Sequence, residues 1–434
     1  MSYCRGTLGI ALAAAFLAGC GGTQLPVQGT PAGRAATLPR DAAHGYQVIY
    51  AFKGTDYGSG DGAFPESLTV MSGKLYGATS QGGSGGAPGC YVLGYTGCGT
   101  LFELRTSGKE SLLHTFEGPP NVEFPLGGVT NLNGAWYGLS YGGRFAQENS
   151  YGYGVVYRVD RSGQEHLVYT FQGGYYGDGA IPHGELVLLD RRFYGTTYNG
   201  GSSYNTRTSH GGYGTVFEVT PSGHERVLHN FKGSDGAYPS AGLIALNGTL
   251  YGTTTQGGKY NLGTVFSITT SGKERVLYSF RGGNDSADPT APLTAVDGAL
   301  YGTTMNALGT GKPPPGTVFK LSLSGGMTVL HRFRSNGRDG AFPQSRLLDL
   351  NGQLYGTTNR GGDDNDGTVF SLSYTGDERI LHSFAGGADG ATPNGDLTVI
   401  DSTLYGTTNG GGYAQCQFFG GKSYACGTVY KLRP

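Results

Sequence analysis

The chain has 434 residues, 82 of them glycine, with a formal net charge of −1 and an aromatic share of 12%. The glycine share is well above the average of roughly 7% but follows no Gly-X-Y period, which excludes a collagen-like fibre. The near-zero charge excludes a broad phosphate-binding surface, so we expect no nucleic-acid partner.

Residues 1–19 have the pattern of a bacterial export signal. Arg5 supplies a positive charge, and Leu8–Ala18 is an apolar run too short to span a bilayer. Cys20 follows Leu-Ala-Gly, as in the lipobox, where the signal is cut before a cysteine that is then acylated. Ordinary signal cleavage beside a chance cysteine is the alternative. We expect a lipid on Cys20 to anchor the chain to the cell envelope, at the outer membrane.

Residues 20–45 read as a tether between this anchor and the rest of the chain. They are rich in Gly, Thr, Pro and Ala and show little apolar periodicity, as flexible linkers do. Residues 46–434 are predicted to form one domain, and we expect it to be monomeric.

A tyrosine motif, Leu250–Thr254 in its fourth copy, recurs along residues 46–434 at spacings of 50 to 61 residues. Its tyrosines are Tyr76, Tyr137, Tyr194, Tyr251, Tyr301, Tyr355 and Tyr405. Self-similarity at such a period is typical of propellers, solenoids and repeat arrays.

Each repeat contains four short segments with the strand pattern. In the fourth copy these are Gly242–Ala245, Thr249–Thr254, Gly263–Ile268 and Arg275–Phe280, separated by glycine-containing turns or a loop. Four strands in about 50 residues correspond to one propeller blade.

The two ends of the array are complementary. Val48–Phe52 has the pattern of a fourth strand with no preceding three, and Gly427–Leu432 that of a third strand with no fourth. If these segments pair, the ring closes and no sheet edge stays open. The fold is therefore predicted to be an all-β, seven-bladed β-propeller of four-stranded antiparallel blades, closed by the N-terminal strand, in preference to an open solenoid.

The signature LYGTT…GG…GTVF…G…VLH-F…DGA-P resembles the GloVer tandem repeat of exported bacterial proteins, across residues 46–434. The second repeat departs most, with Trp136–Ser140 in place of LYGTT and Asn121–Pro125 in place of DGA-P. The resemblance implies a surface-anchored propeller and brings no activity with it. Kelch repeats share the period, but here the glycine pair follows the tyrosine motif, so they are only architectural relatives.

Four histidines occupy one position of the predicted fourth strand, two residues before a phenylalanine. They are His114, His229, His331 and His382, and the other copies have Tyr50, Tyr169 or Tyr278 there. A metal ligand does not exchange freely with tyrosine, whereas a half-buried amphipathic position accepts both. We interpret these histidines as structural.

An acidic or amide residue begins each DGA-P turn. These residues are Asp61, Asn121, Asp178, Asp235, Asp285, Asp339 and Asp389. Seven equivalent positions around a ring cannot converge on one calcium ion, so we expect each to bond its own turn backbone two residues ahead. The denser group Asp363–Asp366 lacks EF-hand spacing and is interpreted as a solvated loop. We expect no metal and no cofactor.

Beyond Cys20 and the Cys4 of the signal, four cysteines remain: Cys90, Cys98, Cys416 and Cys426. In an oxidising compartment four cysteines allow three disulfide connectivities. The economical pairing is Cys90–Cys98 with Cys416–Cys426, and no C-x₂-C spacing indicates zinc.

Loops between the second and third strands are longest in repeats 7, 1, 2 and 3, which ring closure makes neighbours. Aromatic residues are concentrated in these loops, so we predict a binding arc there. Its candidate residues are Tyr95, Tyr151, Tyr204, Phe418 and Phe419. Alternatively, the rings pack among themselves as small satellite clusters.

The sequence thus favours a non-catalytic envelope propeller that binds a glycan, a peptide or a partner protein. One alternative is a polysaccharide-active enzyme with Glu148, Asp178 or Asp235 near the channel mouth, and another is a structural spacer. Such an enzyme needs two carboxylates at a fixed separation, and we find no pair that departs clearly from the repeat pattern.

Overall fold

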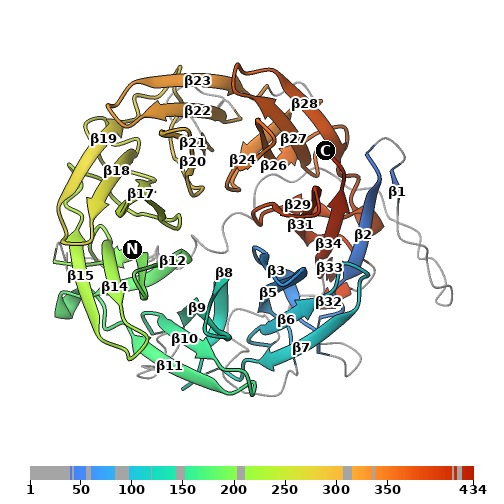
Figure 1. The fold of residues 1–434 in the computed structure, drawn as a ribbon, viewed down its shortest axis with the longest axis horizontal. Coiled ribbons are helices and arrows are strands. Elements are labelled where there is room, and N and C mark those ends of the chain that lie inside the picture. Colours follow the sequence, from blue (N-terminus) through green and yellow to red (C-terminus); the bar gives the residue numbers. More distant parts are fainter. Residues whose placement is uncertain are drawn as a thin grey trace, which may run out of the picture.

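A ring of seven antiparallel blades surrounds a central axis, as the ribbon in Figure 1 shows. The computed structural model describes residues 40–41, 44–54, 60–83, 97–118, 120–142, 152–202, 211–305, 315–334, 338–412, 415–417 and 423–434. No helix among these residues is long and apolar enough to cross a bilayer. The prediction of an all-β, seven-bladed propeller is confirmed, and blades are numbered below by their tyrosine motif.

Two strands of each blade lie nearest the axis. The innermost, in one or two pieces, are β3 (Ala63–Pro65) with β4 (Thr69–Met71), β8 (Glu123–Leu132), β12 (Gly179–Leu189), β16 (Ile244–Leu246), β20 (Thr294–Val296), β24 (Gly340–Pro343) with β25 (Leu348–Leu350), and β29 (Ala391–Pro393) with β30 (Thr398–Ile400). The second strands, which carry the tyrosine motif, are β5 (Lys74–Gln81), β9 (Ala135–Gly142), β13 (Arg192–Gly200), β17 (Thr249–Thr254), β21 (Ala299–Thr304), β26 (Gln353–Gly361) and β31 (Thr403–Gly410).

The other two strands form the outer half of each blade. The third strands are β6 (Thr100–Leu104), β10 (Val155–Val159), β14 (Thr215–Val219), β18 (Thr264–Thr269), β22 (Thr317–Ser322), β27 (Thr368–Ser373) and β34 (Thr428–Leu432). The fourth strands are β7 (Glu110–Thr115), β11 (Glu165–Thr170), β15 (Glu225–Asn230), β19 (Glu274–Ser279), β23 (Met327–Arg332), β28 (Glu378–Ser383) and β2 (Tyr46–Ala51). A short hairpin, β32 (Gln415–Gln417) with β33 (Ser423–Ala425), lies between the second and third strands of blade 7, β31 and β34.

The N-terminal strand closes the ring. β2 pairs antiparallel with β34, with Val48 opposite Tyr430, so the first strand of the domain completes the last blade. The Phe52 amide donates to the Gly427 carbonyl at 3.1 Å at the end of the same pair. This confirms the prediction from the complementary ends. A two-residue strand, β1 (Arg40–Asp41), adds to the outer side of β2 and was not predicted.

The glycine of the tyrosine motif is required by an aromatic ring on the neighbouring strand. Gly252 pairs with Phe266, and a Cβ at Gly252 would lie 2.6 Å from the Phe266 ring. The Phe266 ring in turn receives Phe231 of the preceding blade, edge to face, with ring centroids 5.2 Å apart. All seven blade interfaces contain such an edge-to-face pair, with centroids 5.0 to 5.4 Å apart. A larger residue at the glycine would displace these rings.

The last threonine of the tyrosine motif forms a hydrogen bond within its own blade. The Thr254 hydroxyl lies 2.8 Å from that of Thr264 on β18 and also accepts the Thr264 amide at 3.1 Å. Both threonines are buried, so each satisfies the other's hydroxyl away from water. The recurrent Thr in LYGTT and in GTVF is therefore one buried hydrogen-bonded pair.

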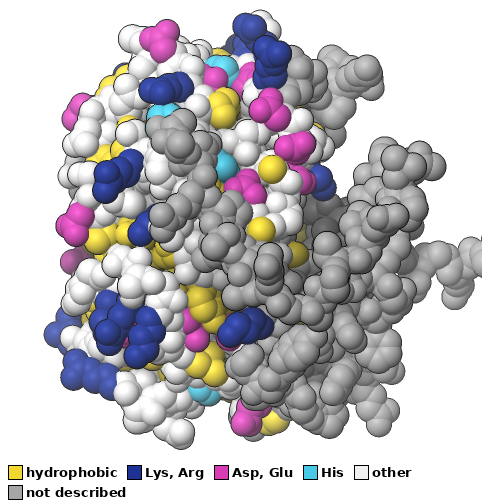
Figure 2. Space-filling view, turned by 90° about the vertical axis from the view of Figure 1, so that its right-hand side faces the viewer, with side chains coloured by type: hydrophobic (Ala, Val, Ile, Leu, Met, Phe, Trp, Pro, Cys, Tyr) yellow, Lys and Arg dark blue, Asp and Glu magenta, His cyan; other side chains and the backbone are white. Residues whose placement is uncertain are grey.

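The hydrophobic core is divided among the seven interfaces and does not fill the axis. One cluster combines Tyr194, Val216 and Phe231 of blade 3 with Leu250 and Phe266 of blade 4, and the other clusters repeat this arrangement. On the rim in Figure 2, basic and acidic side chains are interspersed among neutral ones. Since blade stability comes from these interfaces, the inner strands are free to carry polar residues toward the axis.

Candidate functional site

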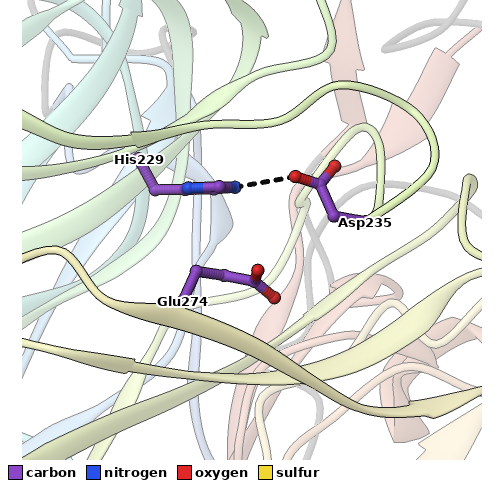
Figure 3. Close-up of side chains that lie close together, drawn as sticks. All are labelled: His229, Asp235 and Glu274. Carbon is purple, nitrogen blue, oxygen red and sulfur yellow. Dashed lines mark hydrogen bonds and ion pairs between the residues drawn. The ribbon is translucent and has the colours of Figure 1, made fainter.

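A histidine or tyrosine, an aspartate and a glutamate meet between consecutive blades, and we call each such set an inter-blade group. In Figure 3, His229 of β15 points at Asp235, which precedes β16, and Glu274 of β19 lies beside them. The His229 Nε2 is 3.1 Å from Asp235 Oδ2. The Lys232 amide donates to Asp235 Oδ1 at 2.8 Å, so Asp235 also holds the backbone of the segment that connects the two blades.

Tyrosine takes the place of histidine in these groups because both can donate a hydrogen bond to the carboxylate. The Tyr50 hydroxyl donates to Asp61 at 2.6 Å, and that of Tyr169 donates to Asp178 at 2.9 Å. This explains the exchange seen in the sequence. The aspartates differ from our expectation, since the carboxylate accepts a backbone amide that precedes it, such as Lys53 before Asp61.

Sequence reasoning missed the glutamate of the inter-blade groups. It begins the fourth strand in five copies, as Glu110, Glu165, Glu225, Glu274 and Glu378. Burial, together with the neighbouring Asp61, raises the pKa of Glu110 to about 7, and burial with Asp178 raises the pKa of Glu225 to about 7. Glu110 and Glu225 therefore hold their protons to near neutrality. The recurrence of Glu six residues before the strand-ending phenylalanine could have identified them.

Four charged side chains from distant blades meet on the inner strands, and we call them the axial group. They are Glu66 of blade 1, Glu185 of blade 3, Arg346 of blade 6 and Asp396 of blade 7. Arg346 Nη2 lies 3.0 Å from Glu185 Oε2, and Arg346 Nε lies 3.4 Å from Asp396 Oδ2. The Arg346 guanidinium thus joins blades 3, 6 and 7. The backbone amide of Arg346 also donates to Asp396 Oδ1 at 2.6 Å.

The carboxylates of the axial group are crowded and only partly neutralised. Burial raises the pKa of Glu66 to about 7, and the nearby Glu185 adds to the rise. Burial also raises the pKa of Glu185, against the opposing charge of Arg346. The Gly127 amide bonds Glu66 and the Gly128 amide bonds Glu185. A Cβ at Gly128 would lie 2.0 Å from Glu185 Oε1, so this approach requires glycine.

The axial group corrects our view that no carboxylate pair departs from the repeat. Glu185, Arg346 and Asp396 all stand three residues after the turn proline, where other copies have Leu, Gly or Pro. Comparison of that position could have found them. Of the carboxylates suggested for an enzyme, Asp178 and Asp235 belong to inter-blade groups, and Glu148 lies outside the described residues.

Further aromatic rings contact one another on blades 3 and 4. Tyr198 stacks on Tyr238 with ring centroids 5.1 Å apart, and His183, two residues from Glu185, has its ring 5.6 Å from Tyr198. Tyr213 meets Tyr238 edge to face at 6.0 Å. Burial lowers the pKa of His183 to about 4, so its imidazole is neutral at neutral pH.

Tyrosines are exposed on the loop face, which we define as the face with the connections between blades and the loops between second and third strands. Tyr175 and Tyr176 are 73% and 71% exposed in the connection from blade 2 to blade 3. Tyr213 and Tyr260, in the loops of blades 3 and 4, are also exposed. Among the described residues the other large apolar side chain that is exposed is Leu112, on the outer strand β7.

The predicted arc lies mostly outside the described residues. This holds for Tyr95, Tyr151, Tyr204, Phe418 and Phe419, as well as for Cys20 and Cys90. Cys416 belongs to β32, of whose side chains nothing is described. Two further aromatics of the arc are described: Tyr213 is exposed, whereas Tyr153 packs against the core between blades 2 and 3. The arc remains a prediction.

The chain is a closed β-propeller with a hydrophobic core at each of its seven blade interfaces. Charged side chains meet at its axis, and its loop face differs from the rest of the ring. The Gloeobacter/Verrucomicrobia repeat matches residues 203–419, and the chain belongs to this family. No curated protein matches the chain.

Solved structures resemble the chain at low identity. The computationally designed Ika8 protein is 15% identical, with a TM-score of 0.47, over 89% of this chain and 100% of that one. A gluconolactonase from Xanthomonas campestris is 14% identical, with a TM-score of 0.40, over 77% and 96%. A puromycin-hydrolyzing peptidase from Mycobacterium tuberculosis is 12% identical, with a TM-score of 0.48, over 90% and 56%. Similarity at this level says nothing about what the chain binds or turns over.

Proposed function

We propose that this chain is an exported propeller, held at the cell envelope by a lipid on Cys20, that binds a glycan on its loop face. The observation that carries the proposal is the set of exposed tyrosines in successive loops of one face: Tyr175, Tyr176, Tyr213 and Tyr260. Single exposed apolar residues are ordinary, but four exposed rings on one face favour an interaction site. Tyrosine combines a flat ring, which stacks on a sugar, with a hydroxyl, at little entropic cost.

The axial group supports the same proposal. Its carboxylates and the Arg346 guanidinium are the charged groups that form strong hydrogen bonds with polar ligand atoms. The stacked Tyr198 and Tyr238 provide further aromatic surface. Exposed rings with a few convergent polar groups are what a carbohydrate site requires.

The test is a glycan array probed with the full chain carrying Cys20→Ser, so that it is released in soluble form. The variant Tyr175→Ala/Tyr176→Ala should lose glycan retention and keep its melting temperature, because exposed substitutions change stability by under about 0.5 kcal/mol. Leu112→Ala is the matched control, since this residue is exposed on the outer strand, away from the loop face. Equal retention by the tyrosine variant and the control would contradict the proposal.

A polysaccharide-active enzyme is the second candidate, and the axial group favours it. The pKa of Glu66 is raised to about 7, in part by Glu185, so one carboxyl holds a proton near a second acidic group. Glycosidases use such a pair as acid and as base or nucleophile. Glycans retained on the array should be followed for cleavage, and loss of cleavage in both Glu66→Gln and Glu185→Gln would assign it to these groups.

The disulfide pairing Cys90–Cys98 and Cys416–Cys426 is part of the proposal. Cys98 and Cys426 are buried and each is disulfide-bonded, as this pairing requires. Cys426 lies in the core at the seam between blades 7 and 1, whereas Cys98 lies in the core between blades 1 and 2. Loops this short gain somewhat less than the ~3 kcal/mol expected for a 15-residue loop.

A further inference from the structure

We propose that two of the inter-blade groups bind a first-row divalent transition metal, with Zn²⁺ the best match to their ligands. The two sites are His229 with Asp235 and Glu274, between blades 3 and 4, and His331 with Asp339 and Glu378, between blades 5 and 6. In each, one histidine nitrogen and two carboxylate oxygens lie within 4.8 Å of one another.

Only these two interfaces combine histidine, aspartate and glutamate within the described residues. Beside His114 the aspartate is replaced by Asn121, and beside His382 the glutamate position is occupied by Tyr46. The remaining three interfaces have tyrosine in place of histidine: Tyr50, Tyr169 and Tyr278. Exchange with tyrosine led us to expect no metal at this position. That argument holds for the three interfaces that have tyrosine, and it does not apply to the two interfaces proposed here.

The interface between blades 5 and 6 shows what a metal would satisfy. His331 Nε2 is 3.5 Å from Asp339 Oδ2, too far for a hydrogen bond, and it is buried without any other partner in the described part of the chain. Glu378 Oε1 is likewise buried without a hydrogen bond. Two unsatisfied ligand atoms therefore adjoin the same carboxylate, and a buried polar atom without a hydrogen bond is destabilising. One cation would satisfy both.

The interface between blades 3 and 4 repeats the arrangement with one difference. Glu274 Oε1 is buried without a hydrogen bond, while His229 Nε2 already bonds Asp235. Here the metal would replace the proton on Nε2, as metal ligation by imidazole requires. Glu110 and Glu225 leave the same oxygen without a partner, but they face tyrosines and serve as comparison interfaces that lack the nitrogen ligand.

The chemistry and access of the ligands suit zinc. Zn²⁺ accepts imidazole nitrogen and carboxylate oxygen at about 2.0–2.2 Å, with water at an open position, whereas Ca²⁺ requires six or more oxygens. The carboxylates are already oriented, because Asp235 accepts the Lys232 amide and Asp339 accepts the Arg334 amide. His331 and Asp339 keep 16% and 10% of their side-chain surface exposed, so the group lies close to solvent.

The experiment measures bound metal on the untagged full chain carrying Cys20→Ser, stripped with chelator and dialysed against micromolar Zn²⁺. Elemental analysis should give two zinc ions per chain. His229→Tyr and His331→Tyr should each hold one and the double variant none, and all three should fold, since tyrosine occupies this position in three other blades. His114→Tyr is the matched control and should hold two. Substitution with Co²⁺ should give the visible absorption bands of a nitrogen-ligated site, absent in the double variant.

Zinc binding that persists in the double variant would overturn the proposal, as would a parent chain that retains no zinc. If a tyrosine variant fails to fold, Glu274→Gln and Glu378→Gln remove a carboxylate instead and should weaken zinc retention at the corresponding site. Unchanged retention in both would count against the assignment. Ca²⁺ at the same concentration should not compete with zinc, and full competition would refute the nitrogen ligand.

Discussion

Replacing Arg346 with methionine should destabilise the ring from its centre. The guanidinium neutralises Glu185 at 3.0 Å and Asp396 at 3.4 Å, and the variant keeps a side chain of similar length but leaves both carboxylates unpaired. An exposed ion pair contributes about 0–1 kcal/mol, whereas removing one partner of a buried pair costs about 3–5 kcal/mol. Arg346 is 31% exposed, and its partners are 22% and 14% exposed, so we expect a loss of about 2–3 kcal/mol.

The assay is urea unfolding, which leaves ionic strength unchanged, on the chain carrying Cys20→Ser. A triple variant, Arg346→Met with Glu185→Gln and Asp396→Asn, should recover most of the loss, because neutral groups no longer repel one another. Arg192→Met is the control: Arg192 pairs with Glu218 but is half exposed, and its loss should cost at most about 1 kcal/mol. If Arg346→Met costs no more than the control, or if the triple variant is no better than the single, charge pairing at the axis is not what stabilises this group.

Four further outcomes are expected. Burial raises the folded-state pKa of Glu123 from 4.5 to about 7, so the contribution of its protonated form to the free energy of unfolding is fully present below pH 4.5 and is lost as pH rises toward 7. The free energy of unfolding of Glu123→Gln should therefore exceed that of the parent by up to about 3 kcal/mol at pH 8 and by nothing at pH 4.5. The control Glu117→Gln, on the surface, should show no such difference. Deletion of Val48–Phe52 should lower the melting temperature or cause aggregation, and a deletion that melts like the parent would contradict closure by β2. Labelling cells with a fatty-acid probe should mark the parent and not Cys20→Ser, and equal labelling would refute the lipid assignment. Peptide mapping without reduction should find each disulfide within one loop, and a peptide that joins the two loops would refute the pairing.

The ring could be predicted because its rules are local and repeated. Gly252 must lie against Phe266 and Thr254 must meet Thr264, so each blade shows the same residues at the same offsets. The strands found in the fourth copy differ from the predicted ones by at most two residues at either end. The closing strand was predictable for the same reason, since Val48–Phe52 has the phenylalanine of every fourth strand.

The axial group could not be predicted by such rules. Glu185 and Arg346 are separated by 161 positions and stand on blades across the ring from each other, so their contact depends on the diameter that seven closed blades impose. The inter-blade groups are intermediate: Asp235 and Glu274 recur in the repeat, but their meeting depends on how one blade rotates onto the next. The tyrosines Tyr175 and Tyr176 were visible in the sequence, but their exposure was not.

The pairing of β2 with β34 also sets the order of events during folding. Val48 is among the first residues of the domain to be synthesised, and its partner Tyr430 comes 382 positions later, near the end. Contacts of such long sequence separation carry a large loop-closure cost and form slowly. Until the last strand is released, blades already formed stand as an open array with an unpaired edge at each end, the state in which β proteins most readily aggregate. A chain that ended before β34 would leave β2 without its partner and the ring open.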